Sequence, residues 1–169
     1  MVKQVMDPRG ILNRALIKLA IDLSTPTINA FFEVSEPETV WGPKFIVIAV
    51  VHPALQGPIF QIIGNTSDWQ EEWGNLEEYK EIALWKARTA QKEGKPTSEL
   101  VLQYPWDLKD GSFLYPGGVV AGKLGVGGSG IIGFADEGAA NVVLSMIMSL
   151  SKLKCSQLRE DDFGQLIEK

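Results

Sequence analysis

The feature that most constrains the fold is an uninterrupted apolar run, Phe45 to Val51. A run of this kind, without polar alternation, predicts a strand that is covered on both faces and therefore lies inside a sheet. Pro53 to Pro58 has the composition of a turn, and Ile59 to Ile63 is again strand-like. The two apolar segments therefore predict a β-hairpin with a longer loop.

The first helix is expected to begin at Asp7-Pro8, because aspartate is a favourable N-cap and proline fits the first helical position. It is expected to end before Ser24-Thr25-Pro26, since proline biases the residue before it away from helical geometry. Its apolar stripe comprises Leu12, Ala15, Leu16, Leu19, Ala20 and Leu23. The following segment, Ile28 to Val34, is compatible with a further strand.

Two more long helices are predicted. Leu76 to Glu93 is rich in strong helix formers and is followed by Gly94, a favourable C-cap. The last helix is expected from about Glu137 to Leu150, with Asp136 as its N-cap. The inward stripe of the earlier helix consists mostly of small residues, which implies a close approach to the sheet: Tyr79, Ile82, Ala83, Ala87 and Ala90. A short helix is expected to start near Thr97.

Composition excludes several classes of function. The net charge is −5 and the 16 basic residues are scattered, which argues against a nucleic-acid partner. The longest apolar run is far shorter than the roughly 20 residues that span a bilayer, so no membrane association is expected. Cys155 is the only cysteine, which excludes an internal disulfide and favours a reducing compartment. A cytoplasmic protein is therefore expected.

A glycine-rich segment follows a predicted strand pair, Val119 to Val126, which turns near Gly122-Lys123. Gly125 to Gly130 matches the pattern G-x-G-x-x-G, but too few residues follow it to complete a dinucleotide-binding unit. Two interpretations stay open. Consecutive backbone N–H groups, together with the next helix N-terminus, could bind a small anion. Alternatively, the glycines only permit tight turns.

His52 is the only histidine, at the end of the buried strand. A lone histidine is more often a hydrogen-bonded structural residue than a base or a ligand, and no Ser–His–Asp arrangement is evident around it. It is nevertheless the best single candidate for a haem-iron ligand, because imidazole suits iron. No catalytic residues are assigned.

Four motifs occur in a fixed order: Ala83 to Ala90 (ALWKARTA), Pro116 to Val119 (PGGV), Leu124 to Gly130 (LGVGGSG) and Asp136 to Ala140 (DEGAA). As a set they resemble the GlcG/HbpS-like haem-binding (haem-degrading) domain family, which also occurs as the C-terminal domain of PduO-type proteins. The resemblance covers about residues 8 to 150. With no linker or repeat in the chain, residues 1–169 are expected to form a single domain with a C-terminal tail, 151–169.

The resemblance implies an α+β fold, with a five-stranded, mainly antiparallel sheet flanked by helices in a profilin-like layout. It also implies a homo-oligomer that binds a small ligand without catalysis, with haem or another tetrapyrrole as the first ligand to test. The ligand site would comprise Tyr115, Gly117, Gly118, Gly125, Gly127, Gly128, Ser129 and Gly130, with Lys86 as a counter-charge. The histidine near the first helix in some haem-binding members has no counterpart here, because residues 1–51 contain none.

Two other classes of function stay open at this point. One is an enzyme acting on a small carbonyl or carboxylate metabolite, with Ser129, Lys86 or Asp136 as its polar groups. The other is a purely structural homo-oligomer subunit, in which the glycine-rich segment and the loop bearing Trp69 and Trp73 form interfaces.

Overall fold

The structure is a computed structural model of the chain, and it describes residues 10–34, 44–67, 74–103, 115–131 and 133–167. The elements in chain order are α1 (Arg14–Val34), β1 (Phe45–Val51), β2 (Ile59–Gly64), α2 (Leu76–Glu93), α3 (Thr97–Gln103), β3 (Gly118–Ala121), β4 (Leu124–Ser129) and α4 (Gly133–Ile167). The α+β class is confirmed. The loop with Trp69 and Trp73 lies outside the described residues.

The strands form one antiparallel sheet in the order β2-β1-β4-β3. Every residue of β1 is buried, which confirms the predicted central strand, and β1 pairs with β2 as the predicted hairpin. Within the described residues the sheet has four strands, so the expected fifth strand is not among them. The candidate strand from Ile28 to Val34 was wrong, because these residues are helical.

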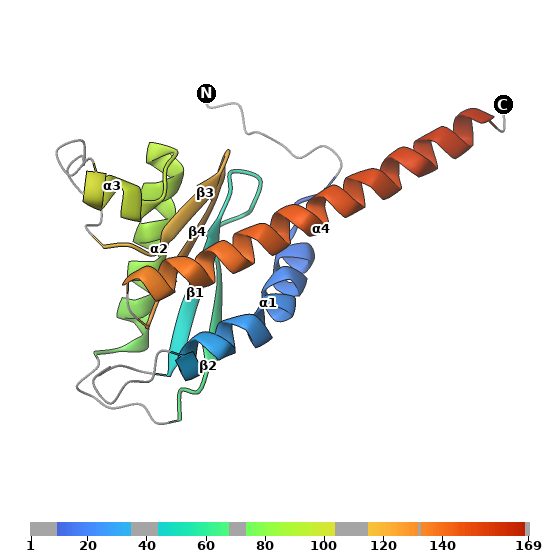
Figure 1. Cartoon of the computed structure of the whole chain (residues 1–169). Helices are drawn as coiled ribbons and strands as arrows, with labels where there is room; N and C mark the ends of the chain where they lie inside the picture. The colour runs from blue at the N-terminus through green and yellow to red at the C-terminus, as the bar shows by residue number, and fades with distance from the viewer. Residues whose placement is uncertain (1–9, 35–43, 68–73, 104–114, 132, 168–169) are drawn as a thin grey trace.

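Helices cover the sheet on both faces, with α1 and α4 on one side and α2 on the other (Figure 1). Alternate side chains of β1 pack on opposite faces of the sheet. Ile46, Ile48 and Val50 join the larger core cluster, which includes α1 and α4. Phe45, Val47 and Ala49 pack with Ala83 of α2. A strand sandwiched in this way has no polar face, which is why its sequence is continuously apolar.

The first helix differs from the prediction at its C-terminal end. The prediction placed that end before Pro26, but α1 continues through this proline to Val34 and changes direction along its length (Figure 1). Proline lacks the N–H that would bond the preceding turn. Its absence leaves the Asp22 carbonyl without its helical donor. Just before the proline, Ser24 Oγ donates to the Ala20 carbonyl at 2.7 Å and Thr25 Oγ1 donates to the Ile21 carbonyl at 3.0 Å, and hydroxyl bonds of this kind bend a helix. The helix can therefore bend at Pro26 without ending.

The start of α1 is set by Asn13, whose Oδ1 accepts the Leu16 N–H at 2.9 Å. The predicted N-cap, Asp7, lies outside the described residues. The core-facing stripe of α1 is also rotated from the predicted one. Leu16 and Ala20 are buried as expected, but Leu19 and Leu23 are about half exposed. The buried positions include instead Ile17, Ile21, Ser24 and Ile28.

The other helices match the prediction more closely. The bounds of α2 are confirmed, and Gly94 ends it in the left-handed conformation, with φ of 70°. The last helix was predicted too short at both ends: α4 begins at Gly133 and runs without interruption to Ile167. None of the helices in the described ranges is both long and apolar enough to cross a membrane.

Candidate functional site

The glycine-rich segment is part of the sheet. The prediction ended its strand at Val126, but β4 continues to Ser129, so Gly127, Gly128 and Ser129 are strand residues rather than loop residues. All of β4 is buried. Gly130 follows with φ of 151°, and a Cβ there would lie 2.3 Å from the Phe45 carbonyl oxygen.

The glycines of β3 and β4 bring helix backbones into direct contact with the sheet. A Cβ at Gly127 would lie 2.0 Å from the Ala83 carbonyl oxygen of α2, and a Cβ at Gly125 would lie 2.5 Å from that of Ala87. A Cβ at Gly118 would lie 2.3 Å from the Lys86 carbonyl oxygen, which is equally tight. On the opposite face, a Cβ at Gly128 would lie 2.5 Å from the Asp136 carbonyl oxygen of α4. Glycine is therefore required here for helix–sheet contact.

Because α2 lies so close to the sheet, the Lys86 side chain reaches the junction between β4 and α4. Its Nζ donates to the Gly128 carbonyl and to Asp136 Oδ2, each at 2.9 Å. The Lys86 and Asp136 side chains are only 4% and 6% exposed. The other carboxylate oxygen of Asp136 accepts the Ile131 N–H at 2.9 Å. The result is a buried ion pair joining three elements that are distant in sequence.

Burial dominates the electrostatics of this ion pair. It raises the pKa of Asp136 above the ordinary value of an aspartate, against the opposing effects of the Lys86 charge and the backbone donors. Burial likewise raises the pKa of Tyr79, and the Asp136 charge adds to that shift. The ion pair thus lies in a poorly solvated environment, in which an additional hydrogen bond to either charge is worth more than in water.

Gly117 packs directly against the Lys86 side chain. A lysine ammonium has three N–H donors, and within the described part of the chain Lys86 Nζ has two acceptors. Gly117 has φ of 132°, and a Cβ on it would lie 2.8 Å from Nζ. The structure therefore brings together Lys86 and Gly117, two of the residues that the resemblance placed in the ligand site.

A second set of contacts fixes the segment that contains Gly117. The Glu137 carboxylate of α4 accepts the Ser98 N–H at 3.1 Å and the Gly117 N–H at 3.4 Å. Thr97 Oγ1 accepts the Gly118 N–H at 2.9 Å. Sequence reasoning missed these roles of Thr97, Ser98 and Glu137. Only the Asp136-Glu137 pair at the start of the last helix indicated that acidic side chains gather here.

Two exposed aromatic side chains border this segment. Tyr115 and Phe134 are each 63% exposed. Tyr115 precedes Pro116 in the chain, and Phe134 follows Gly133. Pro116 and Gly133 are in close contact, since a Cβ on Gly133 would lie 3.2 Å from the Cδ of Pro116. Tyr115 is thus at the surface, whereas Gly117, Gly118 and Lys86 are buried.

His52 lies apart from this cluster, just beyond the end of β1, beside a hollow of about 190 Å³ lined in part by Arg88 and Gln91. Its Nδ1 accepts the Ala54 N–H at 3.0 Å. In the neutral ring the proton is then on Nε2, so neither nitrogen offers a lone pair to iron. In the described ranges no group of three or more histidine, cysteine or acidic residues could hold a metal ion. As placed, His52 does not suit a haem-iron ligand.

The placement of His52 predicts how the haem spectrum depends on this side chain. If hemin binds, its Soret and visible bands are expected to be the same for the wild type and for His52→Ala, because iron coordination does not involve the imidazole. Absorbance titrations of both proteins with hemin would check this. A band shift present in the wild type and lost in His52→Ala would contradict it.

The fold and the site together define a class: an α+β protein whose antiparallel sheet carries a helix directly on its strand glycines, with a buried Lys–Asp pair at the junction. No family model and no curated protein matches the chain. Two solved structures share the fold. Klebsiella pneumoniae protein ORFY, described by the family model DUF336, is 18% identical, with 81% of this chain and 90% of that chain covered and a TM-score of 0.51. HbpS is 19% identical, with 79% and 88% covered and a TM-score of 0.51. The resemblance to GlcG/HbpS-like proteins is therefore confirmed for the fold.

Proposed function

We propose that this chain is a homo-oligomeric small-ligand-binding protein of the GlcG/HbpS-like family, without catalytic residues, and that Lys86 binds a carboxylate or carbonyl oxygen of the ligand. The observation that carries the proposal is the buried Lys86 ammonium, which has two acceptors for its three N–H donors within the described residues. A ligand oxygen that accepts the third N–H would complete the hydrogen bonding of the ammonium.

The surroundings favour a ligand that is partly apolar. Tyr115 and Phe134 are exposed aromatic rings next to the segment that leads to Gly117, and such rings supply contact area for an apolar body. A small organic acid has both parts. A tetrapyrrole with carboxylate side chains belongs to the same chemical class, and it would then be recognised through a carboxylate rather than through its iron.

The matched variants Gly117→Ala and Gly122→Ala test this site. Both glycines have positive φ, so both substitutions introduce backbone strain. Only the methyl group at position 117 would press on Lys86, 2.8 Å from its Nζ, and displace the ammonium. Nothing lies within 4 Å of a Cβ at position 122. We expect native mass spectrometry of freshly purified wild-type protein and of Gly122→Ala to show the same retained small molecule, and Gly117→Ala to lack it.

Direct binding supplies the second readout. Isothermal titration with hemin and with a series of aliphatic and aromatic carboxylates is expected to give saturable binding for at least one compound. The Kd should rise at least about tenfold in Gly117→Ala, the equivalent of losing one charge-assisted hydrogen bond. No retained mass and no saturable binding in the wild type, or equal binding by both variants, would remove the proposal.

A further inference from the structure

The hollow beside His52 contains a cationic side chain without a counter-charge. It has a volume of about 190 Å³ and lies between the loop that joins β1 to β2 and the C-terminal half of α2, from which Arg88 reaches it. Arg88 is exposed, and within the described residues its guanidinium has no hydrogen-bond or ion-pair partner. Its N–H donors are therefore available to another molecule. We call this feature the Arg88 hollow.

The sequence of α2 explains why Arg88 has no counter-charge. On a helix, the side chains that can pair with Arg88 are those three and four residues away. On α2 these are neutral or basic: Leu84, Trp85, Gln91 and Lys92. The acidic residues of the helix lie at other spacings: Glu77, Glu78, Glu81 and Glu93. The helix thus leaves one arginine without an acidic neighbour, in a chain whose net charge is −5.

The loop on the other side of the hollow adds no acidic residue either. Its residues that line the hollow are His52, Pro53, Leu55, Gly57 and Pro58. Because His52 Nδ1 accepts the Ala54 N–H, the second nitrogen of the neutral ring is a donor rather than an acceptor. Arg14 of α1 brings a further guanidinium to the same loop, where it donates to the Gln56 carbonyl at 3.3 Å. These surroundings favour a negatively charged ligand.

The size and the lining of the hollow restrict this ligand further. A volume of about 190 Å³ corresponds to roughly six water molecules at about 30 Å³ each, so only a small molecule fits. Val51, Leu55 and Pro58 supply apolar contact. The fork of one guanidinium matches the two oxygens of a carboxylate, whereas a phosphate dianion calls for further cationic donors. A carboxylate with a short aliphatic tail meets both the charge and the apolar walls.

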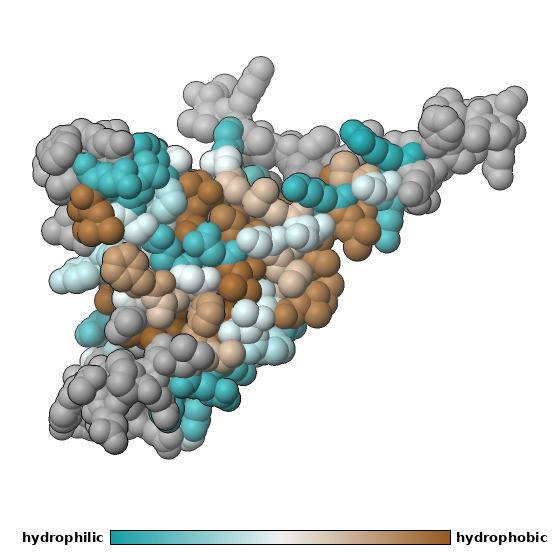
Figure 2. Space-filling view, in the orientation of Figure 1, coloured by the Kyte–Doolittle hydropathy of each residue, from teal (hydrophilic) through white to brown (hydrophobic). Residues whose placement is uncertain are grey.

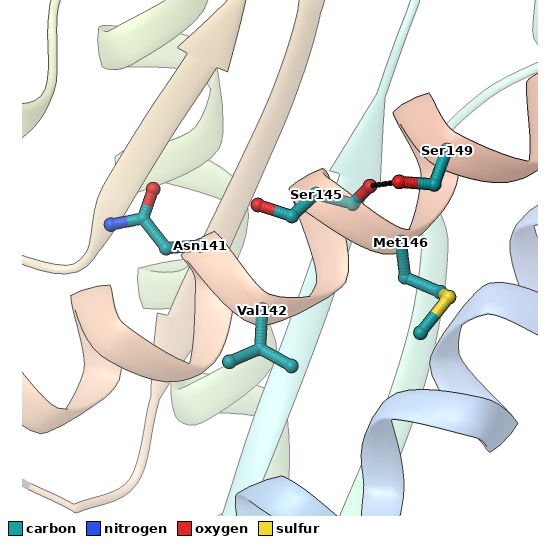
Figure 3. Close-up of a pocket in the computed structure, with 5 residues that line it drawn as sticks. All are labelled: Asn141, Val142, Ser145, Met146 and Ser149. Atoms are coloured by element: carbon teal, nitrogen blue, oxygen red, sulfur yellow. Dashed lines mark hydrogen bonds between the residues drawn. The ribbon is translucent and has the colours of Figure 1, made fainter. Parts of the chain in front are cut away.

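The larger hollow along α4 has a different character. It has a volume of about 380 Å³, and Figure 3 shows its lining residues, none of which is charged: Asn141, Val142, Ser145, Met146 and Ser149. The Ser149 hydroxyl already donates to the Ser145 carbonyl at 2.8 Å. Figure 2 shows hydrophobic residues gathered over this side of the molecule. Nothing among the described residues there selects one kind of ligand, whereas the charge of Arg88 does so in the smaller hollow.

We propose that the Arg88 hollow binds a small aliphatic monocarboxylate. The two carboxylate oxygens accept N–H groups of the guanidinium, and the aliphatic tail contacts the apolar walls. This site is separate from the one proposed at Lys86. Lys86 is buried and donates to the Gly128 carbonyl and to Asp136, whereas Arg88 is exposed on the same helix. Neither site requires the other, so each can be tested alone.

His52 provides a reporter within the hollow. It is the only histidine in the chain, so its imidazole gives a single set of NMR signals in the untagged protein. Titration with butyrate is expected to shift these signals saturably, with a Kd of about 1 mM or lower. Acetate should bind at least about threefold more weakly, because it has less apolar surface to bury. Inorganic phosphate should also bind more weakly than butyrate. Phosphate binding as tight as butyrate binding would contradict the assignment to a monocarboxylate.

Three variants of the full chain test the role of Arg88. Arg88→Gln is expected to raise the Kd for butyrate at least about tenfold, because it removes the charge and the fork of donors. Arg88→Lys keeps the charge without the fork and should raise the Kd at least about threefold. Lys92→Gln is the matched control, since Lys92 is an exposed cation of the same helix outside the hollow. Its Kd should equal that of the wild type. Equal weakening by Arg88→Gln and Lys92→Gln would show an effect of net charge only and overturn the proposal.

Gly117→Ala distinguishes this site from the one at Lys86. It should leave the butyrate shift of His52 unchanged, because Gly117 packs against Lys86 and does not line the hollow. A shift that is lost in Gly117→Ala and kept in Arg88→Gln would place the ligand at Lys86; it would overturn the Arg88 site and support the proposed function. The absence of a saturable shift in the wild type would overturn the Arg88 site alone, since the Lys86 site is measured by its own retained ligand.

Discussion

Gly127→Ala is expected to destabilise the fold by about 3 kcal/mol or more, at the upper end of the range for overpacked cores. The added Cβ would lie 2.0 Å from the Ala83 carbonyl oxygen and 2.7 Å from the Ala87 backbone nitrogen. Both contacts are with the backbone of α2, which cannot move aside by a change of rotamer. The helix would have to separate from the sheet, and Lys86 would move with it. Urea unfolding followed by circular dichroism would measure the loss.

Gly138→Ala is the matched control for this substitution. Gly138 lies in α4, and a Cβ there would make an ordinary contact of 3.4 Å with the Phe31 ring. Neither glycine has a positive φ, so the two variants differ mainly in the space around the new methyl group. Gly138→Ala should be neutral or stabilise the protein by up to about 1 kcal/mol through helix propensity. Equal stability of the two variants would show that α2 does not need the glycines of β4.

The sequence predicted the elements that local pattern determines. The apolar run of β1 predicts a strand that is buried on both faces. The strong helix formers of α2, together with Gly94, predict both ends of that helix. It did not predict that α1 passes through Pro26, because the continuation of the helix depends on tertiary packing, including the burial of Ile28 in the core. Local preference before a proline favours a helix end, and tertiary packing overrides it here.

The candidate site was only partly predictable. The glycine pattern was visible, but a pattern of glycines has the same appearance whether it receives a ligand or a helix backbone. The small residues of the α2 stripe favoured the second possibility, contact with a helix backbone. Ala83 and Ala87 do contact Gly127 closely. Lys86 could be named from the motif, yet its pairing with Asp136, 50 residues away, follows only from the arrangement of α2 and α4 across the sheet.

Lys86→Met is expected to cost about 3–5 kcal/mol at neutral pH, because it leaves the Asp136 carboxylate buried without its counter-charge. Lys80→Met is the control on the same helix. Lys80 pairs with Glu77, whose side chain is 75% exposed, and removing such a pair should cost less than about 1 kcal/mol. The double variant Lys86→Met with Asp136→Asn should recover part of the loss, since it removes both charges. In that variant a side-chain oxygen still remains for the Ile131 N–H.

The cost of Lys86→Met should also depend on pH. Burial already raises the pKa of Asp136, and Lys86 is the largest of the opposing effects, so its removal should raise that pKa further. A carboxyl whose pKa is higher in the folded than in the unfolded protein stabilises the fold when it is protonated, and it loses that contribution as the pH rises through the folded pKa. The deficit of Lys86→Met relative to the wild type should therefore shrink between neutral pH and about pH 5. Urea unfolding at both pH values would measure it. The same deficit at both would mean that Asp136 remains ionised in the variant, and that the carboxylate has found another source of stabilisation at the junction of β4 and α4.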